Sequence, residues 1–348
     1  MRALTFHGRE DIRCESLPDP ALQAPTDVIV KVHLAGLCGS DLHIYHGREK
    51  GLDPGTVMGH EFVGEIAEVG REVEKFKRGD RVLAPFTTNC GKCFYCHRGL
   101  TARCPHGQLF GWVQNGAGLQ GGQAEFVRVP LADATLLKMP AEALPEEALL
   151  LGDAFSTGYF CAEMAQLDPR ATCAVIGCGP VGLMAILAAR HLGAERIYAI
   201  DAIPERLALA QDFGAIPVNF HQENPVDIVR AVTEGRGADA VLEIVGNESA
   251  LRLAMALVRP GGIIAAAGVH HEAQFAFTPA EAYDKNLTYR TGRCSARYYA
   301  GRLLSLLQQR KHELARLISH RLPLAQGAQA YQIFAEKQDG CIKVILQP

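Results

Sequence analysis

The stretch TCAVIGCGPVGLMAILAARHLG, residues 172–193, decides the fold of this chain. It begins with a short apolar run and continues with Gly177, Gly179 and Gly182 in the pattern G-x-G-x-x-G. Apolar residues at helical spacing follow. This order predicts a buried β-strand, a tight turn and an α-helix. Glycine suits the turn because a residue without a Cβ atom lets other groups approach the backbone closely.

The same alternation of strand and helix continues to residue 291. Further strands are expected at 196–200, 216–218, 240–245, 262–268 and 287–291, with helices at 203–214, 224–235 and 247–261 between them. Such regular alternation predicts a parallel sheet with helices on both faces. Six strands match the doubly wound sheet that binds dinucleotides.

Asp201 ends the second of these strands, about twenty residues after the glycine pattern, as a dinucleotide-binding fingerprint requires. We expect a pyrophosphate at the start of the helix, where the helix dipole attracts negative charge. The Asp201 carboxylate would accept hydrogen bonds from the adenosine ribose and repel a 2′-phosphate, which favours NAD over NADP. Arg206, one helical turn later, is a cation that could contact such a phosphate if the loop allowed it, so NADP stays the alternative cofactor. The alternative is a glycine-rich turn that only packs tightly. The expected cofactor residues here are Gly177, Gly179, Pro180, Val181, Gly182, Asp201 and Arg206.

The residues before and after this unit lack its regular alternation of strands and helices. Short strands broken by glycine and proline are expected at 28–35, 61–69, 80–84 and 124–129, which predicts an irregular, mostly antiparallel β unit. After residue 293, two helical segments at 296–309 and 325–338 precede a strand at 341–347. These last residues are too few for a core of their own, so we expect them to pack on the first domain. The predicted domains are 1–154, 155–295 and 296–348.

The stretch GLCGSDLHIYHGREKGLDPGTVMGHE, residues 36–61, carries candidate metal ligands. Cys38 offers a thiolate and His60 an imidazole, and polar side chains at Ser40, Asp41 and His43 stand near Cys38. This combination is typical of a catalytic zinc site, but two ligands do not hold a metal. A third ligand must therefore come from elsewhere in the chain.

Four further cysteines, Cys90, Cys93, Cys96 and Cys104, lie within the segment 88–106 in the pattern C-x2-C-x2-C-x7-C. Four thiolates this close can enclose one tetrahedral zinc with no open position, which predicts a structural zinc lobe. The alternatives are an iron–sulfur cluster, whose usual spacing differs, and disulfides.

The bulk composition excludes several classes of function. The chain has 348 residues, 48% of them hydrophobic, and a formal net charge of -3. It should therefore form a globular protein without a basic footprint for nucleic acid. No apolar run approaches the length of a membrane span, and the opening MRALTFHGRED lacks the pattern of a signal peptide. A cytoplasmic location is expected, where the 11 cysteines are better explained by metal or free thiols than by disulfides.

Several motifs together resemble the zinc-dependent medium-chain dehydrogenase/reductase family, the alcohol dehydrogenases with a GroES-like and a Rossmann domain. They are GLCGSDLH, GHEFVGEI, GDRV, the four-cysteine lobe, GDAFSTGYF and the GCGPVG turn, and they span nearly the whole chain. The resemblance implies an α/β chain with a GroES-like, mostly antiparallel β catalytic domain beside the six-stranded doubly wound sheet. It also implies a catalytic zinc in the cleft between the domains and NAD(P)-dependent interconversion of alcohols with aldehydes or ketones.

The resemblance assigns roles to residues around the metal. Cys38 and His60 match the first two ligands of the catalytic zinc, and Asp153 matches the third, where many members have cysteine. For Asp153 a helix cap is the alternative role. Glu61 matches an occasional ligand, or else a buried carboxylate paired with a basic residue. The remaining matches are Asp41, which would orient the zinc histidine, and Ser40 and His43, which would pass the substrate proton outward.

The resemblance also places residues around the cofactor and the substrate. Val245, Gly268 and Val269 would flank the nicotinamide end, and Lys343 matches a basic residue that approaches the pyrophosphate. Phe86 and Trp112 would line an apolar substrate pocket, although Trp112 can equally be a core residue.

The expected protein is therefore an NAD-dependent zinc alcohol dehydrogenase with two zinc ions per chain, one catalytic and one structural. Its expected substrates are small primary or secondary alcohols, hydrophobic or cyclic, with no nucleic acid or membrane partner. A homotetramer is expected by analogy. The alternatives within the family are a threonine or polyol dehydrogenase and a formaldehyde dehydrogenase, which the segment GGQAEFVRVPLAD resembles. Outside enzymes, a zinc-free cofactor-binding protein is the alternative.

Overall fold

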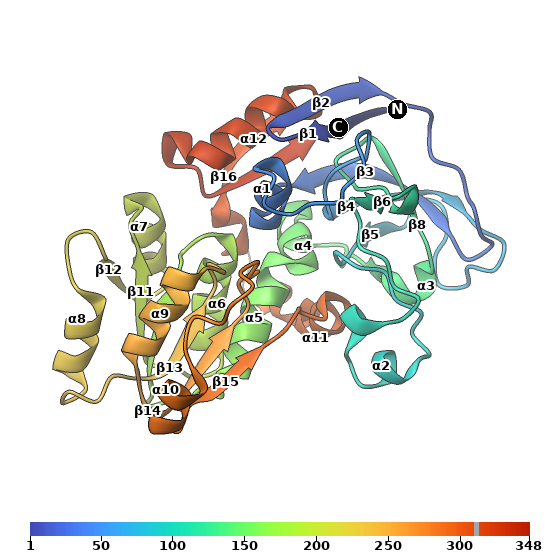
Figure 1. Cartoon of the computed structure of the whole chain (residues 1–348). Helices are drawn as coiled ribbons and strands as arrows, with labels where there is room; N and C mark the ends of the chain where they lie inside the picture. The colour runs from blue at the N-terminus through green and yellow to red at the C-terminus, as the bar shows by residue number, and fades with distance from the viewer. Residues whose placement is uncertain (310–312) are drawn as a thin grey trace. The chain divides into compact units, whose positions relative to one another are not determined.

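The computed structural model describes residues 1–309 and 313–348. These residues form two compact units, the first made of 1–156 and 295–348 and the second of 157–294. Figure 1 traces the chain through both, and each unit is described by itself.

The first unit is built on a seven-stranded sheet whose order is β16-β17-β3-β4-β5-β9, with β8 added beside β3, counted over the described residues. Neighbouring strands are antiparallel except β16 and β17, which are parallel. The expectation of a mostly antiparallel β unit is confirmed. The strands of this sheet are β3 (Val28–Gly36), β4 (Glu61–Val69), β5 (Arg81–Leu83), β8 (Phe126–Val129), β9 (Leu137–Lys138), β16 (Ile318–Pro323) and β17 (Lys343–Gln347).

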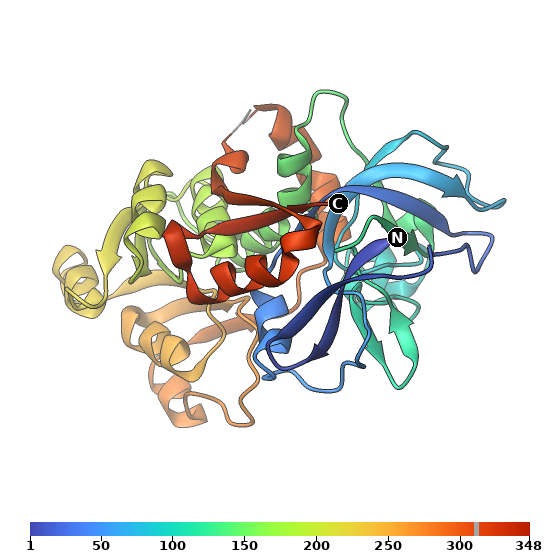
Figure 2. The same cartoon turned by 90° about the horizontal axis from the view of Figure 1, so that it is seen from above.

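The strand β3 organises this sheet because three strands pair with it. β4 pairs along its whole length, β8 pairs with its first half, and β17 pairs with its last two residues, Ala35 and Gly36. Alternate residues Val28, Val30 and Val32 are buried in the main core of the unit. Figure 2 shows the C-terminal segment, in red, running beside the blue N-terminal part of the unit. The last strand is therefore part of the sheet that carries the end of β3.

Short helices and two hairpins complete the first unit. The helix α4 begins with Pro145 at its first position and has Glu146 and Glu147 in its first turn, a sequence that suits the positive end of a helix. It packs on β3, β4 and β5, and α12 packs on β2 and β17. The remaining elements are the hairpin strands β1 (Arg2–Gly8), β2 (Asp11–Ser16), β6 (Trp112–Gln114) and β7 (Ala117–Leu119), and the helices α1 (Gly39–Tyr45), α2 (Phe94–His97), α3 (Ala132–Thr135), α4 (Pro145–Gly152), α5 (Ala154–Met164), which continues into the second unit, α11 (Ala296–Gln309) and α12 (Gly327–Glu336). Short 3-10 turns lie at Thr101–Arg103, Leu314–Leu317, Leu324–Gln326 and Gln338–Gly340.

The second unit is a parallel sheet with helices. Within its residues the strand order is β12-β11-β10-β13-β14-β15, six strands that all run parallel. This is the doubly wound order that begins at a central strand and reverses, so the fold class expected from the sequence is confirmed. The strands are β10 (Thr172–Ile176), β11 (Arg196–Asp201), β12 (Ile216–Asn219), β13 (Ala238–Glu243), β14 (Val258–Ala266) and β15 (Thr288–Thr291); the helices are α6 (Pro180–His191), α7 (Pro204–Asp212), α8 (Pro225–Val232), α9 (Glu248–Leu257) and α10 (Pro279–Asp284).

Six described strands of the first unit were not predicted from the sequence: β1, β2, β6, β7, β9 and β16. In β1 three consecutive residues, Ala3, Leu4 and Thr5, are all buried, so the strand lacks a pattern of alternating burial. Ala3 packs with Val57 and Ala124, whereas Leu4 joins the main core. A strand buried on both faces by different partners gives no period-2 signal.

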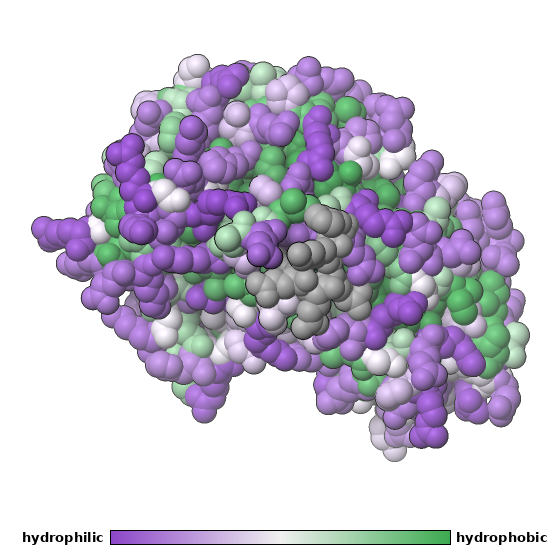
Figure 3. Space-filling model, turned by 180° about the vertical axis from the view of Figure 1, so that it is seen from behind, coloured by the Kyte–Doolittle hydropathy of each residue, from purple (hydrophilic) through white to green (hydrophobic). Residues whose placement is uncertain are grey.

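The surface gives no sign of a membrane span. No helix within 1–309 or 313–348 combines the length and the apolar character needed to cross a bilayer. On the face shown in Figure 3, hydrophilic side chains are spread widely and hydrophobic ones are scattered among them.

The close approach of β3 and β4 depends on Gly64. A Cβ atom there would lie 2.1 Å from the carbonyl oxygen of Lys31, at a place where the register of the two strands shifts. We predict that Gly64→Ala lowers the free energy of unfolding by about 1–3 kcal/mol, because the strands must move apart. Gly39→Ala is the control, since no atom lies within 4 Å of the added carbon. Urea unfolding of both variants measures the difference, and equal midpoints would contradict the prediction.

Candidate functional site

Cys38 lies at the turn between β3 and α1. It is the residue just before the helix, and its backbone N–H donates to Oδ2 of Asp41 over 2.9 Å. An acidic side chain at the third helical position is typical of a helix start, because it satisfies a backbone donor that the helix leaves free. The local sequence Cys-Gly-Ser-Asp therefore fixes the position of the thiol.

His60 reaches the same place through the pairing of β3 with β4. Gly36, at the end of β3, lies opposite Glu61, at the start of β4, so Cys38 and His60 flank one end of a strand pair. Asp153 follows the last residue of α4, which packs against both strands. Its Oδ2 lies 3.4 Å from Sγ of Cys38 and 3.4 Å from Nε2 of His60. Strand pairing and helix packing thus bring three residues, distant in sequence, to one point.

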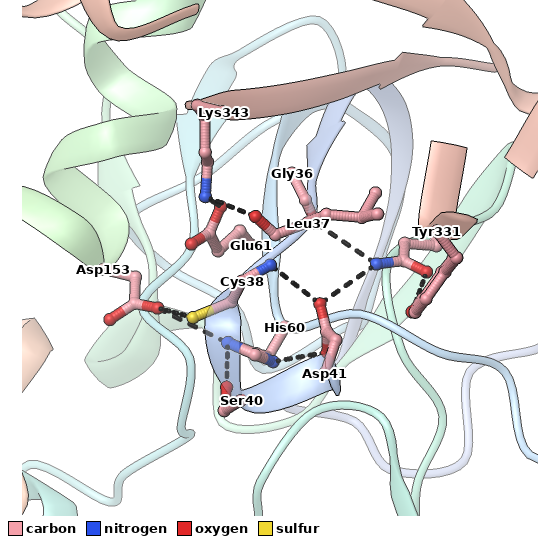
Figure 4. A network of polar contacts seen from close by, with 11 residues as sticks. Gly36, Leu37, Cys38, Ser40, Asp41, His60, Glu61, Asp153, Tyr331 and Lys343 are labelled. Atoms are coloured by element: carbon pink, nitrogen blue, oxygen red, sulfur yellow. Dashed lines mark hydrogen bonds and ion pairs between the residues drawn. The ribbon is translucent and has the colours of Figure 1, made fainter. Parts of the chain in front are cut away.

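Ligand atoms of Cys38, His60, Glu61 and Asp153 all lie within 4.8 Å of one another. Figure 4 shows the Asp153 carboxylate facing the sulfur of Cys38 and the imidazole of His60. Sulfur, nitrogen and carboxylate oxygen are the ligand atoms that zinc takes in proteins. Asp153 also directly precedes α5, so a position at the start of a helix and a side chain directed at the cluster occur together.

The pKa shifts in this cluster are those expected of a site that binds a cation. Burial raises the pKa of the Cys38 thiol, and the charge of Asp153 raises it further. Burial acts to lower the pKa of His60, but the carboxylates of Asp41 and Asp153 outweigh it and raise that pKa well above its ordinary value. Burial raises the pKa of Glu61 as well. Acidic groups this close compete for protons, and a divalent cation would relieve that competition.

Glu61 has one engaged and one unengaged oxygen. Its Oε2 accepts a hydrogen bond from the Lys343 ammonium group, which also donates to the carbonyl oxygen of Leu37 over 2.8 Å. Its Oε1 is buried and has no hydrogen-bond partner among the described residues. A buried oxygen without a partner is the kind of atom that a metal ion would satisfy.

The structure shows the surroundings of Lys343, which the family resemblance assigns to the pyrophosphate. β17 pairs with the end of β3 and buries the Lys343 side chain to 1% exposure. Because the ammonium is enclosed and bound to Glu61 and Leu37, it does not present a charge at the surface of the first unit. The expected alternative for Glu61, a carboxylate paired with a basic residue, describes the same contact.

A chain of buried polar groups supports the far side of the His60 ring. Oδ1 of Asp41 lies 3.4 Å from Nδ1 of His60. Gln123 donates to Oδ2 of Asp41 over 3.3 Å and accepts a hydrogen bond from the Tyr331 hydroxyl over 2.9 Å. Gln123 and Tyr331 are fully buried. The sequence analysis assigned them no role, because the segment around Gln123 was considered only for its resemblance to another enzyme group.

The other residues predicted near the metal differ in how close they lie. Oγ of Ser40 is 3.4 Å from Nε2 of His60, and His43 follows on the same short helix, half-buried. The ring of Phe86 stands edge-on to His60, with 6.3 Å between the ring centres. Trp112 is half-buried in the β6–β7 hairpin and packs against the main core. Phe86 therefore lies beside His60, whereas the described contacts of Trp112 are with the core.

The four lobe cysteines also converge, with sulfur atoms within 4.8 Å of one another. Sγ of Cys93 accepts the backbone N–H of Cys96, and Sγ of Cys104 accepts that of Cys90. The backbone hydrogen bond from Cys96 lowers the pKa of Cys93 to about 7. Every cysteine in the described part of the chain is a free thiol, and the Cys93 and Cys104 sulfurs are 3.9 Å apart, beyond any disulfide bond length. The arrangement suits a tetrathiolate metal site.

Two positions of the glycine pattern in the second unit require glycine because of backbone conformation and close approach. Gly177 has a φ of +88°, and a Cβ atom on Gly182 would lie 1.8 Å from the carbonyl oxygen of Gly177. Pro180 begins α6, with Val181 next, so the turn presents backbone N–H groups at a helix start. At the end of β11, Asp201 accepts hydrogen bonds from the backbone N–H groups of residues 178, 202 and 203.

Arg206 is the cation that lies beside Asp201 at the nucleotide turn. Nη1 of Arg206 lies 4.0 Å from Oδ2 of Asp201. The Nε of Arg206 is buried and has no hydrogen-bond partner within the described residues. Asp201 thus ends β11, and Arg206 lies beside it from the first turn of α7.

The two loops expected to flank the nicotinamide lie against each other. A Cβ atom on Gly246 would be 2.5 Å from the backbone nitrogen of Val269, and one on Gly268 would be 2.2 Å from that of Gly246. Glu243, fully buried at the end of β13, joins them: it accepts hydrogen bonds from the N–H groups of Val245 and Gly246, and its other oxygen lies 2.9 Å from Nε2 of His270. The sequence analysis missed Glu243, which looked like one residue of an apolar strand.

Comparisons with known proteins agree with this geometry. Residues 24–141 match the family model of the alcohol dehydrogenase GroES-like domain, and residues 180–309 match that of the zinc-binding dehydrogenases. Zinc-type alcohol dehydrogenase B of Aspergillus flavus is 42% identical, over 96% of this chain and 78% of its own length. Sorbitol dehydrogenase of Bacillus subtilis is 32% identical, over 100% of this chain and 97% of its own.

Among solved structures, this chain is similar to alcohol dehydrogenase TADH from Thermus sp. ATN1. The two are 44% identical, with a TM-score of 0.93, and the match covers 100% of this chain and 99% of the other. The family models and the relatives identify zinc-binding dehydrogenases. The two units and the candidate metal cluster around Cys38 agree with that assignment. The chain belongs to the zinc-dependent alcohol dehydrogenases of the medium-chain dehydrogenase/reductase family.

Proposed function

We propose that this chain is an NAD-dependent alcohol dehydrogenase with two zinc sites, a catalytic one at Cys38, His60 and Asp153 and a structural one at the four lobe cysteines. The observation that carries the proposal is the position of Asp153, whose Oδ2 is 3.4 Å from both the Cys38 sulfur and the His60 nitrogen. Three protein ligands of this kind, with one position left for substrate, are typical of a catalytic zinc.

The protein's own residues prepare the site for a proton transfer. Zinc held here would supply Lewis acidity that makes an alcohol proton easier to remove, and NAD would accept the hydride. Asp41 holds Nδ1 of His60, which leaves Nε2 directed at Cys38 and Asp153. The Ser40 hydroxyl faces the same point and would take the substrate proton. His43, later on the same helix, would pass it outward, since imidazole ordinarily titrates near neutral pH.

The choice of NAD rests on Asp201. Asp201 is the last residue of β11 and lies beside the glycine turn. There its carboxylate would accept hydrogen bonds from the ribose hydroxyls and repel a 2′-phosphate. The neighbouring guanidinium of Arg206 is 4.0 Å away, so part of that negative charge is already balanced. We therefore expect a preference for NAD with measurable use of NADP.

The substrates we propose are hydrophobic or cyclic primary and secondary alcohols, because Phe86 stands beside His60 and is buried. A polyol such as sorbitol is the second candidate, favoured by the relatedness to sorbitol dehydrogenase of Bacillus subtilis. Threonine and formaldehyde are the remaining alternatives. A cytoplasmic location is supported by the free thiols throughout the described residues, and a homotetramer rests on the family resemblance alone.

Zinc content and dehydrogenation should change together when Asp153 is altered. We predict about two zinc ions in the wild type and about one in Asp153→Asn, which loses an anionic ligand, with kcat/KM falling more than about 100-fold. Atomic absorption gives the metal count, and NAD reduction is assayed with hexanol, cyclohexanol, sorbitol, threonine and formaldehyde.

The matched control is Asp19→Asn, because the Asp19 side chain is 69% exposed and its ion pair within the described residues is with the N-terminus. It should keep both metals and full activity. Two zinc ions and wild-type turnover in Asp153→Asn would contradict the ligand assignment. Turnover confined to sorbitol, threonine or formaldehyde would contradict the proposed substrate class.

Zinc binding at the catalytic site should release protons. In the metal-free protein the pKa of Cys38 is raised by burial, and that of His60 is raised by Asp41 and Asp153, so both hold a proton at neutral pH. Zinc binds thiolate and neutral imidazole, so we predict release of about two protons and an affinity that rises with pH. Calorimetry in buffers of different ionisation enthalpy measures the release. Cys38→Ser is the control that isolates this site from the lobe; an equal release in both proteins would refute the prediction.

Removing the Asp201 charge should weaken the cofactor preference. Asn retains the oxygen that accepts the N–H groups of residues 202 and 203 but loses the acceptor for the N–H of Cys178, so circular dichroism first checks that Asp201→Asn is folded. We predict that the ratio of kcat/KM for NAD over NADP falls by about tenfold, because the repulsion of the 2′-phosphate is lost. Steady-state kinetics with both cofactors tests this, and an unchanged ratio would show that Asp201 does not set the preference.

A further inference from the structure

The pair formed by Lys343 and Glu61 is unusual in its burial. Both side chains are 1% exposed, and the ammonium group bonds to Glu61 and to the carbonyl oxygen of Leu37, the residue before Cys38. Figure 4 shows Lys343 reaching from the last strand toward Glu61, on the side of the carboxylate away from Asp153. One cation from β17 therefore contacts the elements that carry Cys38, His60 and Glu61.

Stability alone does not account for such a pair. Removing two charges from water costs several kcal/mol per ion, and buried ion pairs are often replaced by apolar residues without loss. The pair also leaves Oε1 of Glu61 buried without a hydrogen-bond partner among the described residues, and the Glu61 carboxylate belongs to the cluster with Cys38, His60 and Asp153. An unsatisfied buried oxygen is destabilising, so the arrangement indicates a function at the metal site.

The charges of the cluster balance only when Lys343 is counted. Ionised Cys38, Glu61 and Asp153 carry three negative charges, and the Lys343 ammonium reduces them to two. A divalent cation then makes the buried group neutral. Without Lys343 the same residues would exceed the metal's charge, and the free carboxylate of Glu61 would be drawn to the metal as an additional ligand.

We propose that Lys343 is a positioning residue that holds Glu61 beside the catalytic metal but off it, so that the position for the substrate stays open. Lys343 competes with the metal for the Glu61 carboxylate, and its bond to Leu37 fixes that carboxylate relative to Cys38. The inference rests on the zinc site proposed above.

Cobalt-substituted protein tests this without turnover, since the visible spectrum of cobalt reports its ligands and imidazole can occupy an open position. We expect imidazole to change the wild-type spectrum. In Lys343→Met its affinity should fall by about tenfold or more, because Glu61 takes the open position. The double variant Lys343→Met with Glu61→Gln should recover wild-type affinity for imidazole, because the carboxylate that takes the open position is gone.

Lys138→Met is the matched control, because that lysine is exposed and pairs with Asp80 at the surface; it should bind imidazole like the wild type. If Lys343→Met does not fold, Lys343→Gln replaces it, since its amide can donate to Glu61 and Leu37 without a charge, and the same loss is expected. Wild-type imidazole affinity in the folded variant overturns the role of Lys343 alone. Absence of cobalt from the Cys38 site in the wild type overturns the proposed function instead.

Discussion

The antiparallel pairing of β3 with β4 is the constraint on which the candidate metal centre depends. The register places Gly36 opposite Glu61, so the turn after one strand and the residue before the other meet at one end of the pair. Cys38 and His60 then face each other, and α4, packed on both strands, adds Asp153. The two strands approach so closely that Gly64 cannot carry a side chain without moving its neighbour. The ligand geometry is thus a consequence of sheet register and helix packing in the first unit.

The buried charges then determine what the cluster can hold. Three acidic side chains, one histidine and one lysine are enclosed with few other polar partners. Hydrogen bonds from the described residues satisfy most of these groups. Asp41 accepts hydrogen bonds from the Gln123 amide and the Cys38 backbone N–H, and Glu61 accepts one from the Lys343 ammonium group. Cys38, His60 and Asp153 remain, with their ligand atoms close together and the Glu61 carboxylate nearby. A divalent cation is the simplest group that satisfies these three, while Glu61 stays bound to Lys343.

The sequence predicted the fold well where its signals are local. The glycine pattern, Asp201 and the alternating apolar segments predicted the parallel sheet of the second unit, because each strand and helix is encoded by consecutive residues. Cys38, His60 and Asp153 were found by resemblance, and spacing alone would not have joined residues more than ninety positions apart. Gln123, Tyr331 and the true partner of Lys343 could not be predicted, because their contacts depend on the register of β17 and on helix packing. The strand β1 was missed because its burial does not alternate.

We propose that Cys38, His60 and Asp153 hold the catalytic metal while Lys343 keeps Glu61 from joining them. X-ray diffraction from crystals of the zinc-loaded protein, with anomalous data on both sides of the zinc absorption edge, tests this most directly. We expect one anomalous peak among the four lobe cysteines and a second bounded by Cys38, His60 and Asp153, with the Lys343 ammonium still bonded to Glu61. A second peak that is absent, or one bound by Glu61 with Asp153 turned away, would contradict it.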